Sequence, residues 1–208
     1  GCGRISQNHI KALQEHSTNV DIAAVCDTDI NKINETATLT DAKGFQDINE
    51  FLKNGNIDIV SLCTPSGLHP IQGTMAAKNG IHVLTEKPMA VDLKSGKEFV
   101  NACANSNVNL FVVKQNRLND TSQIVKKAIE QGRFGKIYMI VSNVFWTRPQ
   151  SYYEQAKWRG TWEMDGGAFM NQASHYVDMV NWLAGSDVHS VYANTATLAR
   201  NIEAEDSG

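Results

Sequence analysis

The sequence predicts an α/β protein in which a doubly wound parallel sheet is followed by a second α/β domain with an open, largely antiparallel sheet. Two observations lead to this prediction. In the first half, short β-branched runs alternate with stretches of helical periodicity, which is typical of parallel strands joined by right-handed crossovers. After Arg117 the strands become longer and the alternation stops, which is more typical of antiparallel pairing.

Each expected element follows from the local pattern of apolar residues. Short apolar runs predict buried strands in the first half, over residues 20–26, 57–63, 81–84 and 110–113. Helical periodicity predicts helices between them, over residues 30–39, 47–53, 69–79 (ended by Gly80) and 92–105. In the second half we expect helices over residues 121–131 (ended by Gly132) and 166–183, and long strands over 137–146 and 188–198.

The change at Arg117 predicts two domains, residues 1–117 and 118–208. Both ends look cut, because Gly1 opens inside a glycine loop with no strand before it and residues 205–208 follow a strand that needs sheet partners. We therefore expect a piece of a longer protein. The first strand of the first domain and the C-terminal part of the second are expected to lie outside these 208 residues.

Composition and charge favour small-molecule partners. With 42% hydrophobic residues the chain can bury a core, and its net charge of −3 attracts neither nucleic acid nor an anionic membrane. No apolar run approaches the ~18 residues that span a bilayer, and no leader-like segment is visible, so we expect a cytoplasmic protein. The four cysteines lack metal-ligand spacing, and we expect ordinary thiols and no metal at Cys2, Cys26, Cys63 and Cys103.

The chain opens on a glycine loop of the form G-x-G-x-x-S, with glycines at Gly1 and Gly3. Such glycines permit a tight turn and the close approach of a pyrophosphate to a helix N-terminus. Asp27 directly follows the predicted strand at 20–26, where a carboxylate accepts ribose hydroxyls; no neighbouring arginine could hold a 2′-phosphate. The pair predicts a Rossmann-like first domain that prefers NAD to NADP. Alternatively, these are ordinary turn glycines and Asp27 caps a helix.

The tripeptide Glu86-Lys87-Pro88 follows a predicted strand, behind the glycine loop and a second loop at residues 64–69. With the segment 166–178, which is similar to a GGG-x3-D-x3-H-x2-D signature, it resembles the glucose-fructose oxidoreductase / inositol dehydrogenase (Gfo/Idh/MocA) family over essentially the whole chain. The resemblance implies a Rossmann domain, NAD, and an open second sheet used for oligomerisation, hence a homodimer or tetramer. We expect the cofactor to contact Gly1, Gly3, Arg4, Ile5, Asp27, Thr64, Pro65, Ser66, His69, Glu86, Lys87 and Gln115.

More narrowly, the motifs GCGRIS, KQNRLN, NVFWTRPQSYY and WRGTWE together resemble family members that act on nucleotide-linked uronic acids in bacterial surface polysaccharide (lipopolysaccharide) synthesis. That resemblance implies oxidation of a ring hydroxyl, expected at C3, of a UDP-linked N-acetylglucosaminuronic acid. One residue departs from the family pattern, since the usual aspartate of the signature is Asn171 here. An amide at this position argues for hydrogen bonding rather than acid–base work.

Oxidation of a secondary alcohol needs a group that takes the hydroxyl proton, while the cofactor accepts the hydride. Lys87 lies at the C-terminal edge of a predicted strand, where burial near a cationic nicotinamide can lower the pKa of a lysine. Asn171, His175 and Asp178 are spaced i, i+4 and i+7 and should share one helix face. We expect Lys87 and His175 to form the acid–base pair, in either order. The alternatives are a solvated lysine and a structural histidine.

An acidic substrate also needs cations. Arg148 and Arg159 lie in the aromatic loop 146–162, where guanidinium groups suit carboxylate and diphosphate oxygens and Tyr152 can pack on the sugar or uracil. The alternative is a structural loop with solvated arginines. Two other functions stay open: a dehydrogenase of another sugar or polyol such as inositol, and a non-catalytic NAD- or sugar-binding regulator. The expected substrate-binding residues are Lys87, Arg117, Arg148, Tyr152, Arg159, Asn171 and His175.

Overall fold

The computed structural model describes residues 1–208, which form two compact units, Gly1–Val112 and Val113–Gly208. The first unit holds five short strands in two sheets: β1 (Ala24–Cys26) with β2 (Lys43–Phe45), and β3 (Ile59–Leu62), β4 (His82–Thr85) and β5 (Leu110–Val112) in that order. Every pairing is parallel, so the predicted parallel α/β architecture is confirmed. Four of the strands lie inside the predicted runs or overlap them, and β2 was not predicted.

Helices connect these strands as the sequence pattern predicts: α1 (Ser6–Glu15), α2 (Ile30–Thr40), α3 (Ile48–Asn54), α4 (His69–Lys78) and α5 (Leu93–Asn105). Three of them begin at an aspartate whose carboxylate accepts a backbone N–H of the first turn. These caps are Asp29, Asp47 and Asp92. The cap of α2 is thus Asp29, and the alternative in which Asp27 caps that helix is wrong. Gly80, with a φ of 75°, follows the end of α4 as expected.

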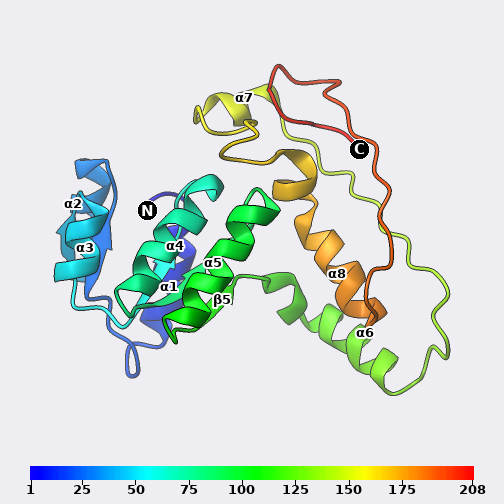
Figure 1. Cartoon of the computed structure of the whole chain (residues 1–208), viewed down its shortest axis with the longest axis horizontal. Coiled ribbons are helices and arrows are strands. Elements are labelled where there is room, and N and C mark those ends of the chain that lie inside the picture. Colours follow the sequence, from blue (N-terminus) through cyan, green and yellow to red (C-terminus); the bar gives the residue numbers. More distant parts are fainter. The chain divides into compact units, whose positions relative to one another are not determined.

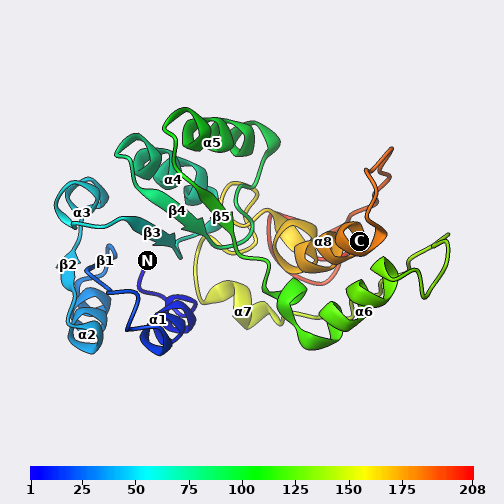
Figure 2. The ribbon, with the colours of Figure 1, turned by 90° about the horizontal axis from the view of Figure 1, so that it is seen from below.

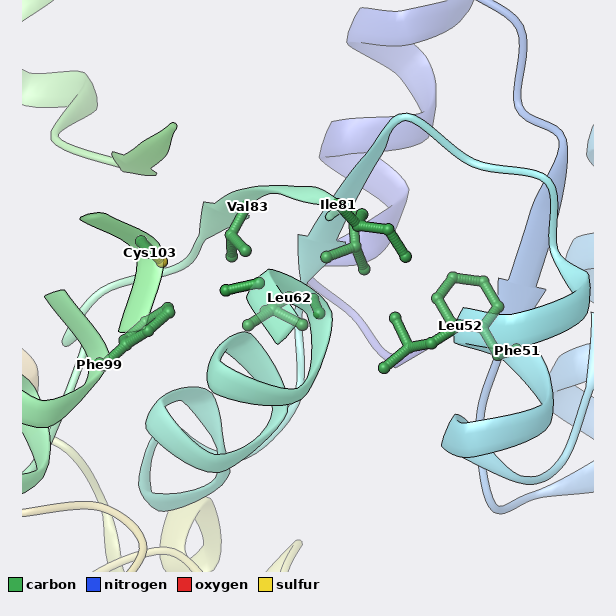
Figure 3. Packing of buried hydrophobic residues seen from close by; sticks show 10 residues of the cluster. Phe51, Leu52, Leu62, Ile81, Val83, Phe99 and Cys103 are labelled. Atoms are coloured by element: carbon green, nitrogen blue, oxygen red, sulfur yellow. The ribbon is translucent and has the colours of Figure 1, made fainter. Parts of the chain in front are cut away.

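The main core of the first unit lies between the three-stranded sheet and its helices. Helices α4 and α5 lie side by side (Figure 1), with β3, β4 and β5 running beneath them in Figure 2. Val83 of β4 and Phe99 of α5 are fully buried and belong to the same hydrophobic cluster (Figure 3). Gly73 of α4 packs so closely against the Phe99 ring that any side chain there would overlap it. This packing holds α4 and α5 against the sheet, and so fixes the positions of the strands.

The second unit contains η2 (Gln115–Leu118), α6 (Asp120–Glu130), α7 (Gln150–Glu154), the π-helical turn η3 (Ala168–Gln172) and α8 (Ser174–Ala184). Helices α6 and α8 contact each other and lie side by side (Figure 1). Gly132 follows α6 in a left-handed conformation, with a φ of 71°, as predicted.

The strands predicted at residues 137–146 and 188–198 do not form in this structure, where the second unit has only an isolated antiparallel bridge between Ala196 and Ser207. The physical reason is that alternation decides which side chains share a face, whereas a strand also needs a hydrogen-bonded neighbour. Phe145 and Tyr192, from these two segments, are accordingly 93% and 86% exposed.

The helix predicted over residues 166–183 begins later and in two parts. Gly166 and Gly167 have φ values of 82° and 81° and lie outside it, and the Ala173 N–H donates to the Ala168 carbonyl, an i to i+5 bond of a π-turn. Asn171 lies in this turn while His175 and Asp178 lie on α8. The expected single face for all three therefore needs correction, since the wider turn shifts Asn171 relative to the other two.

Candidate functional site

The glycine loop and the acidic residue meet at one edge of the first unit. The carboxylate of Asp27, just after β1, accepts the Cys2 N–H at 2.7 Å and the Asp29 N–H at 2.9 Å. Burial acts to raise the pKa of Asp27, but these backbone hydrogen bonds hold it below its usual value. A Cβ at Gly1 would lie only 2.8 Å from the Cys63 carbonyl oxygen, whereas nothing lies within 4 Å of a Cβ at Gly3. Asp27 is thus an ionised carboxylate next to an open glycine loop.

Further residues predicted to bind the cofactor lie after Gly3, after β3 and in the second unit. Arg4 and Ile5 form the exposed turn that leads into α1, and Ser6 locks the turn by donating to the Gly3 carbonyl at 2.6 Å. Thr64 and Pro65 follow β3, and Ser66 begins the short helix η1 (Ser66–Leu68). Gln115 lies in η2 of the second unit.

Glu86 and Lys87 directly follow β4, and both carboxylate oxygens of Glu86 have a hydrogen-bond partner. Its Oε1 contacts Nε2 of His9, on α1, at 2.8 Å, and its Oε2 accepts the Lys87 N–H at 3.2 Å. The side chains of His9 and Glu86 are only 14% and 12% exposed. Nδ1 of the same histidine contacts the Ser61 hydroxyl at 3.0 Å. A buried ion pair therefore joins the helix after the glycine loop to the residue before Lys87.

The pKa values of this pair move in the directions of an ion pair. Hydrogen bonding to Cys63 and to the carboxylate of Glu86 raises the pKa of His9 to about 10. Burial acts to raise the pKa of Glu86, but the hydrogen bond to His9 and the charge of Lys87 hold it below its usual value. His9 is therefore cationic and Glu86 anionic at neutral pH.

His69, at the start of α4, contacts Pro88, the residue that follows Lys87, and its side chain is 1% exposed. Its Nδ1 contacts the Pro88 carbonyl oxygen at 2.8 Å and its Nε2 contacts the Thr64 carbonyl oxygen at 2.9 Å. Burial lowers the pKa of His69, although the two carbonyls act to raise it. Both ring nitrogens contact backbone, so His69 joins the two loops, and its expected contact with a cofactor stays a prediction.

In the second unit, Arg117 forms an ion pair with Asp178. Its guanidinium donates two hydrogen bonds to the carboxylate, at 2.8 and 2.7 Å, and Nζ of Lys114 lies 3.8 Å away. Burial acts to raise the pKa of Asp178, but Arg117 and Lys114 hold it below its usual value. Arg117 thus forms a clamp between η2 and α8, and its predicted substrate contact stays a prediction.

Asn171 and His175 are both buried, at 8% and 6% exposure. The side-chain amide of Asn171 donates to the carboxylate of Asp165, which is 2% exposed and also accepts the Gly160 N–H at 2.7 Å. A buried carboxylate thus orients Asn171 as a hydrogen-bonding group, the role expected for an amide at this position. Asp165 carried no signal in the sequence, because its partner is fixed only by the π-turn.

The predicted arginines of the aromatic loop form a stack with its rings. The Arg148 guanidinium carbon lies 3.8 Å from the ring centroid of Trp146 and 5.2 Å from that of Tyr152, and that of Arg159 lies 4.1 Å from Tyr152. Tyr152 also contacts η3, since its hydroxyl accepts from Gln172 at 3.3 Å. The Nε atoms of Arg148 and Arg159 are buried without an acceptor. A buried N–H of a charged group without a partner favours an anionic ligand.

Sequence reasoning missed the residues that hold this loop in place. Asp206 accepts the N–H groups of Leu198, Ala199 and Arg200, which lower its pKa to about 2 against the effect of burial. Arg200 in turn donates to the Arg148 carbonyl. Arg200 and Arg148 lie 52 residues apart in the chain, beyond the range of any local motif.

Comparisons with known proteins agree with this geometry. Residues 1–114 match the family described as an oxidoreductase family with an NAD-binding Rossmann fold, and residues 122–208 match the GFO/IDH/MocA C-terminal domain. The chain is 25% identical over 201 residues, 95% of its length and 57% of the relative, to a myo-inositol 2-dehydrogenase of Thermotoga maritima.

Two solved structures are more similar. One is the WlbA dehydrogenase from Bordetella pertussis in complex with NADH and UDP-GlcNAcA (57% identity, TM-score 0.96). The other is WlbA from Chromobacterium violaceum in the same complex (53%, TM-score 0.96). Each alignment covers 99% of this chain and 59% of the solved one.

The chain spans about half the length of the curated relatives it matches, 47% and 57% of the first two. None of its helices is both long and apolar enough to cross a membrane. The two domain matches together extend over nearly all of its 208 residues. The chain therefore belongs to the Gfo/Idh/MocA family of oxidoreductases, with an NAD-binding Rossmann domain and the C-terminal domain of that family.

Proposed function

We propose that the whole protein is an NAD-dependent dehydrogenase that oxidises a ring hydroxyl, expected at C3, of a UDP-linked N-acetylglucosaminuronic acid. The observation that carries the proposal is the identity of 57% and 53%, over 99% of the chain, to two dehydrogenases crystallised with NADH and UDP-GlcNAcA. The local geometry supports it, since this chain has a glycine loop with an ionised carboxylate and an arginine stack suited to an anion.

The residues of the first unit fit the cofactor. The open space at Gly3 lets a pyrophosphate approach the N-terminus of α1, and Asp27 suits the ribose hydroxyls. When bound, NAD supplies the hydride acceptor. Lys87 and His175 move the hydroxyl proton, while Asn171, held by Asp165, donates or accepts a hydrogen bond on the sugar.

Cofactor preference tests the role of Asp27. NAD is expected to bind at least about tenfold more tightly than NADP, roughly 1.4 kcal/mol, because an ionised carboxylate repels a 2′-phosphate. Asp27→Ala should narrow that ratio, and Asp21→Asn, which removes an exposed charge just before β1, should leave it unchanged. Calorimetry with both cofactors measures the ratios. Equal affinities in the unmodified protein would rule out the assignment.

Substrate charge tests the arginine stack. Replacing Arg148 or Arg159 by alanine should raise KM for the UDP-uronic acid by about 10-fold or more, the effect of losing a charge-assisted hydrogen bond of roughly 1.5–3 kcal/mol. KM for the neutral UDP-hexose should rise much less. Arg133→Ala, an exposed arginine of the same unit, is the matched control. The assignment fails if neither stack variant separates the two substrates.

The reaction itself is tested by anaerobic incubation of the whole protein with NAD, a panel of UDP-sugars and myo-inositol. NADH absorbance should rise with the UDP-uronic acid, and product mass identifies the oxidation. Turnover of inositol alone would favour a polyol dehydrogenase, the second candidate function, which the similarity to a myo-inositol 2-dehydrogenase supports. NAD binding without turnover of any substrate would favour a non-catalytic regulator.

We also propose that the protein works in the cytoplasm. All four cysteines are free thiols, which suits the reducing cytoplasm. We also propose a homo-oligomer, a dimer or tetramer, assembled through the second domain. Light scattering of the whole protein checks that state.

A further inference from the structure

Outside the groups already given a chemical role, two histidines of the first unit remain to be explained, one buried and one largely buried. His9 comes from α1 and His69 from the start of α4. Neither is placed to meet a substrate through its ring nitrogens, because all four nitrogens contact protein atoms at 2.8 to 3.0 Å. What the two share is their target: each holds a residue directly next to Lys87 in the chain.

We propose that His9 and His69 are positioning residues that fix Lys87 from its two chain neighbours, Glu86 and Pro88. This inference rests on the proposed function, in which Lys87 moves the hydroxyl proton. On the N-terminal side, His9 holds one oxygen of Glu86 and the other oxygen receives the Lys87 N–H. On the C-terminal side, His69 holds the Pro88 carbonyl.

These contacts are partly or fully buried, and each histidine is also anchored through its second ring nitrogen. Nδ1 of His9 contacts Ser61 on β3, and Nε2 of His69 contacts the carbonyl of Thr64, just after the same strand. The Glu86 N–H also donates to the Leu62 carbonyl at 3.0 Å. Both chain neighbours of Lys87 are thereby connected, through His9 and His69, to β3 or to the residues just after it. Breaking a buried ion pair leaves the remaining charge without compensation, so removal of His9 frees Glu86 to move.

Misplacement of a reacting group by about 1 Å can cost on the order of 10²-fold in rate. We therefore expect His9→Ala to lower kcat by about that factor, while KM for the sugar and the NAD dissociation constant change by less than about threefold. His9→Gln, whose amide can still donate to Glu86, should recover most of the loss. His69→Gln should lower kcat by a smaller factor, since a flexible amide can still donate to the Pro88 carbonyl but lacks the rigid ring that lies between that carbonyl and the carbonyl of Thr64.

The matched control is His82→Ala. This histidine lies at the opposite end of β4, where its Nδ1 accepts the Asn109 N–H, and its removal should leave kcat unchanged. Thermal unfolding and NAD calorimetry on each variant separate misplacement from loss of fold. If His9→Ala does not fold, His9→Gln and His69→Gln carry the test through the same split between kcat and KM.

The decisive comparison is the double variant of His9→Ala with Lys87→Ala, in the whole protein under saturating NAD and sugar. A positioning residue acts only through the group it positions, so the double variant should be as slow as Lys87→Ala alone. If Lys87→Ala is slow and His9→Ala slows it further by the same factor, the positioning role is overturned while the proposed function stands. If Lys87→Ala turns over at nearly the normal rate, the proposed role of Lys87 falls and the positioning role falls with it.

Discussion

Replacing Lys87 by alanine is expected to lower kcat by about 10² to 10⁴-fold, the usual contribution of a general acid or base, while NAD affinity is retained. The half-buried Lys87 lies at the carboxyl end of β4, where parallel α/β sheets bind their ligands. His175→Ala should lower kcat by a factor in the same range. Steady-state kinetics by NADH absorbance, with calorimetry for NAD, measures both.

The two losses should not multiply. Groups that serve one proton transfer lose their effect together, so the double alanine variant should be scarcely slower than the poorer single variant. Lys78→Ala, which removes an exposed lysine of α4, is the control for a loss of charge alone. Multiplicative losses would mean that Lys87 and His175 assist different steps.

Gly167→Ala is expected to destabilise the second unit by about 3 kcal/mol or more. Gly167 has φ 81° and ψ −171°, a region that is essentially restricted to glycine and costs another residue about 1–3 kcal/mol. In addition, the carboxylate of Glu205 occupies the position of an added Cβ, and it is held there by the Phe169 N–H at 3.0 Å. The variant must therefore displace a buried carboxylate as well as strain the backbone.

Gly132→Ala provides the matched comparison. Its φ is also positive, at 71°, but nothing lies within 4 Å of an added Cβ, so it should cost only about 1–2 kcal/mol. Urea unfolding followed by circular dichroism gives the two midpoints. Equal midpoints for the two variants would show that the Glu205 contact does not matter for stability. Because η3 starts at Ala168, Gly167→Ala should also disturb Asn171 and reduce turnover.

The sequence predicted those parts of the fold in which local pattern and tertiary structure agree. The apolar runs at residues 57–63 and 81–84 contain or overlap β3 and β4 because Val60, Leu62 and Val83 pack in the main core. The helices begin close to their aspartate caps. β2 escaped prediction because three residues that include Gly44 carry no strand pattern. The long strands of the second half were wrong for this structure because alternation says nothing about a partner.

The candidate site divides in the same way. Asp27 and Lys87 could be proposed from the sequence because each lies at or just past the end of a predicted strand. His9 was missed because its partner Glu86 lies 77 residues away, and a helix histidine carries no sign of such a pairing. The i, i+4, i+7 spacing misled for Asn171, since only the structure reveals the π-turn.

The arginine stack also gives the protein an optical reporter. Of its four tryptophans, Trp146, Trp158 and Trp162 lie in the aromatic loop, and the first two have a guanidinium over their rings, at 3.8 and 5.8 Å. An anion that draws Arg148 or Arg159 toward itself must change the charge above these indoles, and hence their emission. Titration with UDP alone, followed by intrinsic fluorescence, should therefore register occupancy of the loop without cofactor or turnover, and Arg148→Ala should silence most of the change.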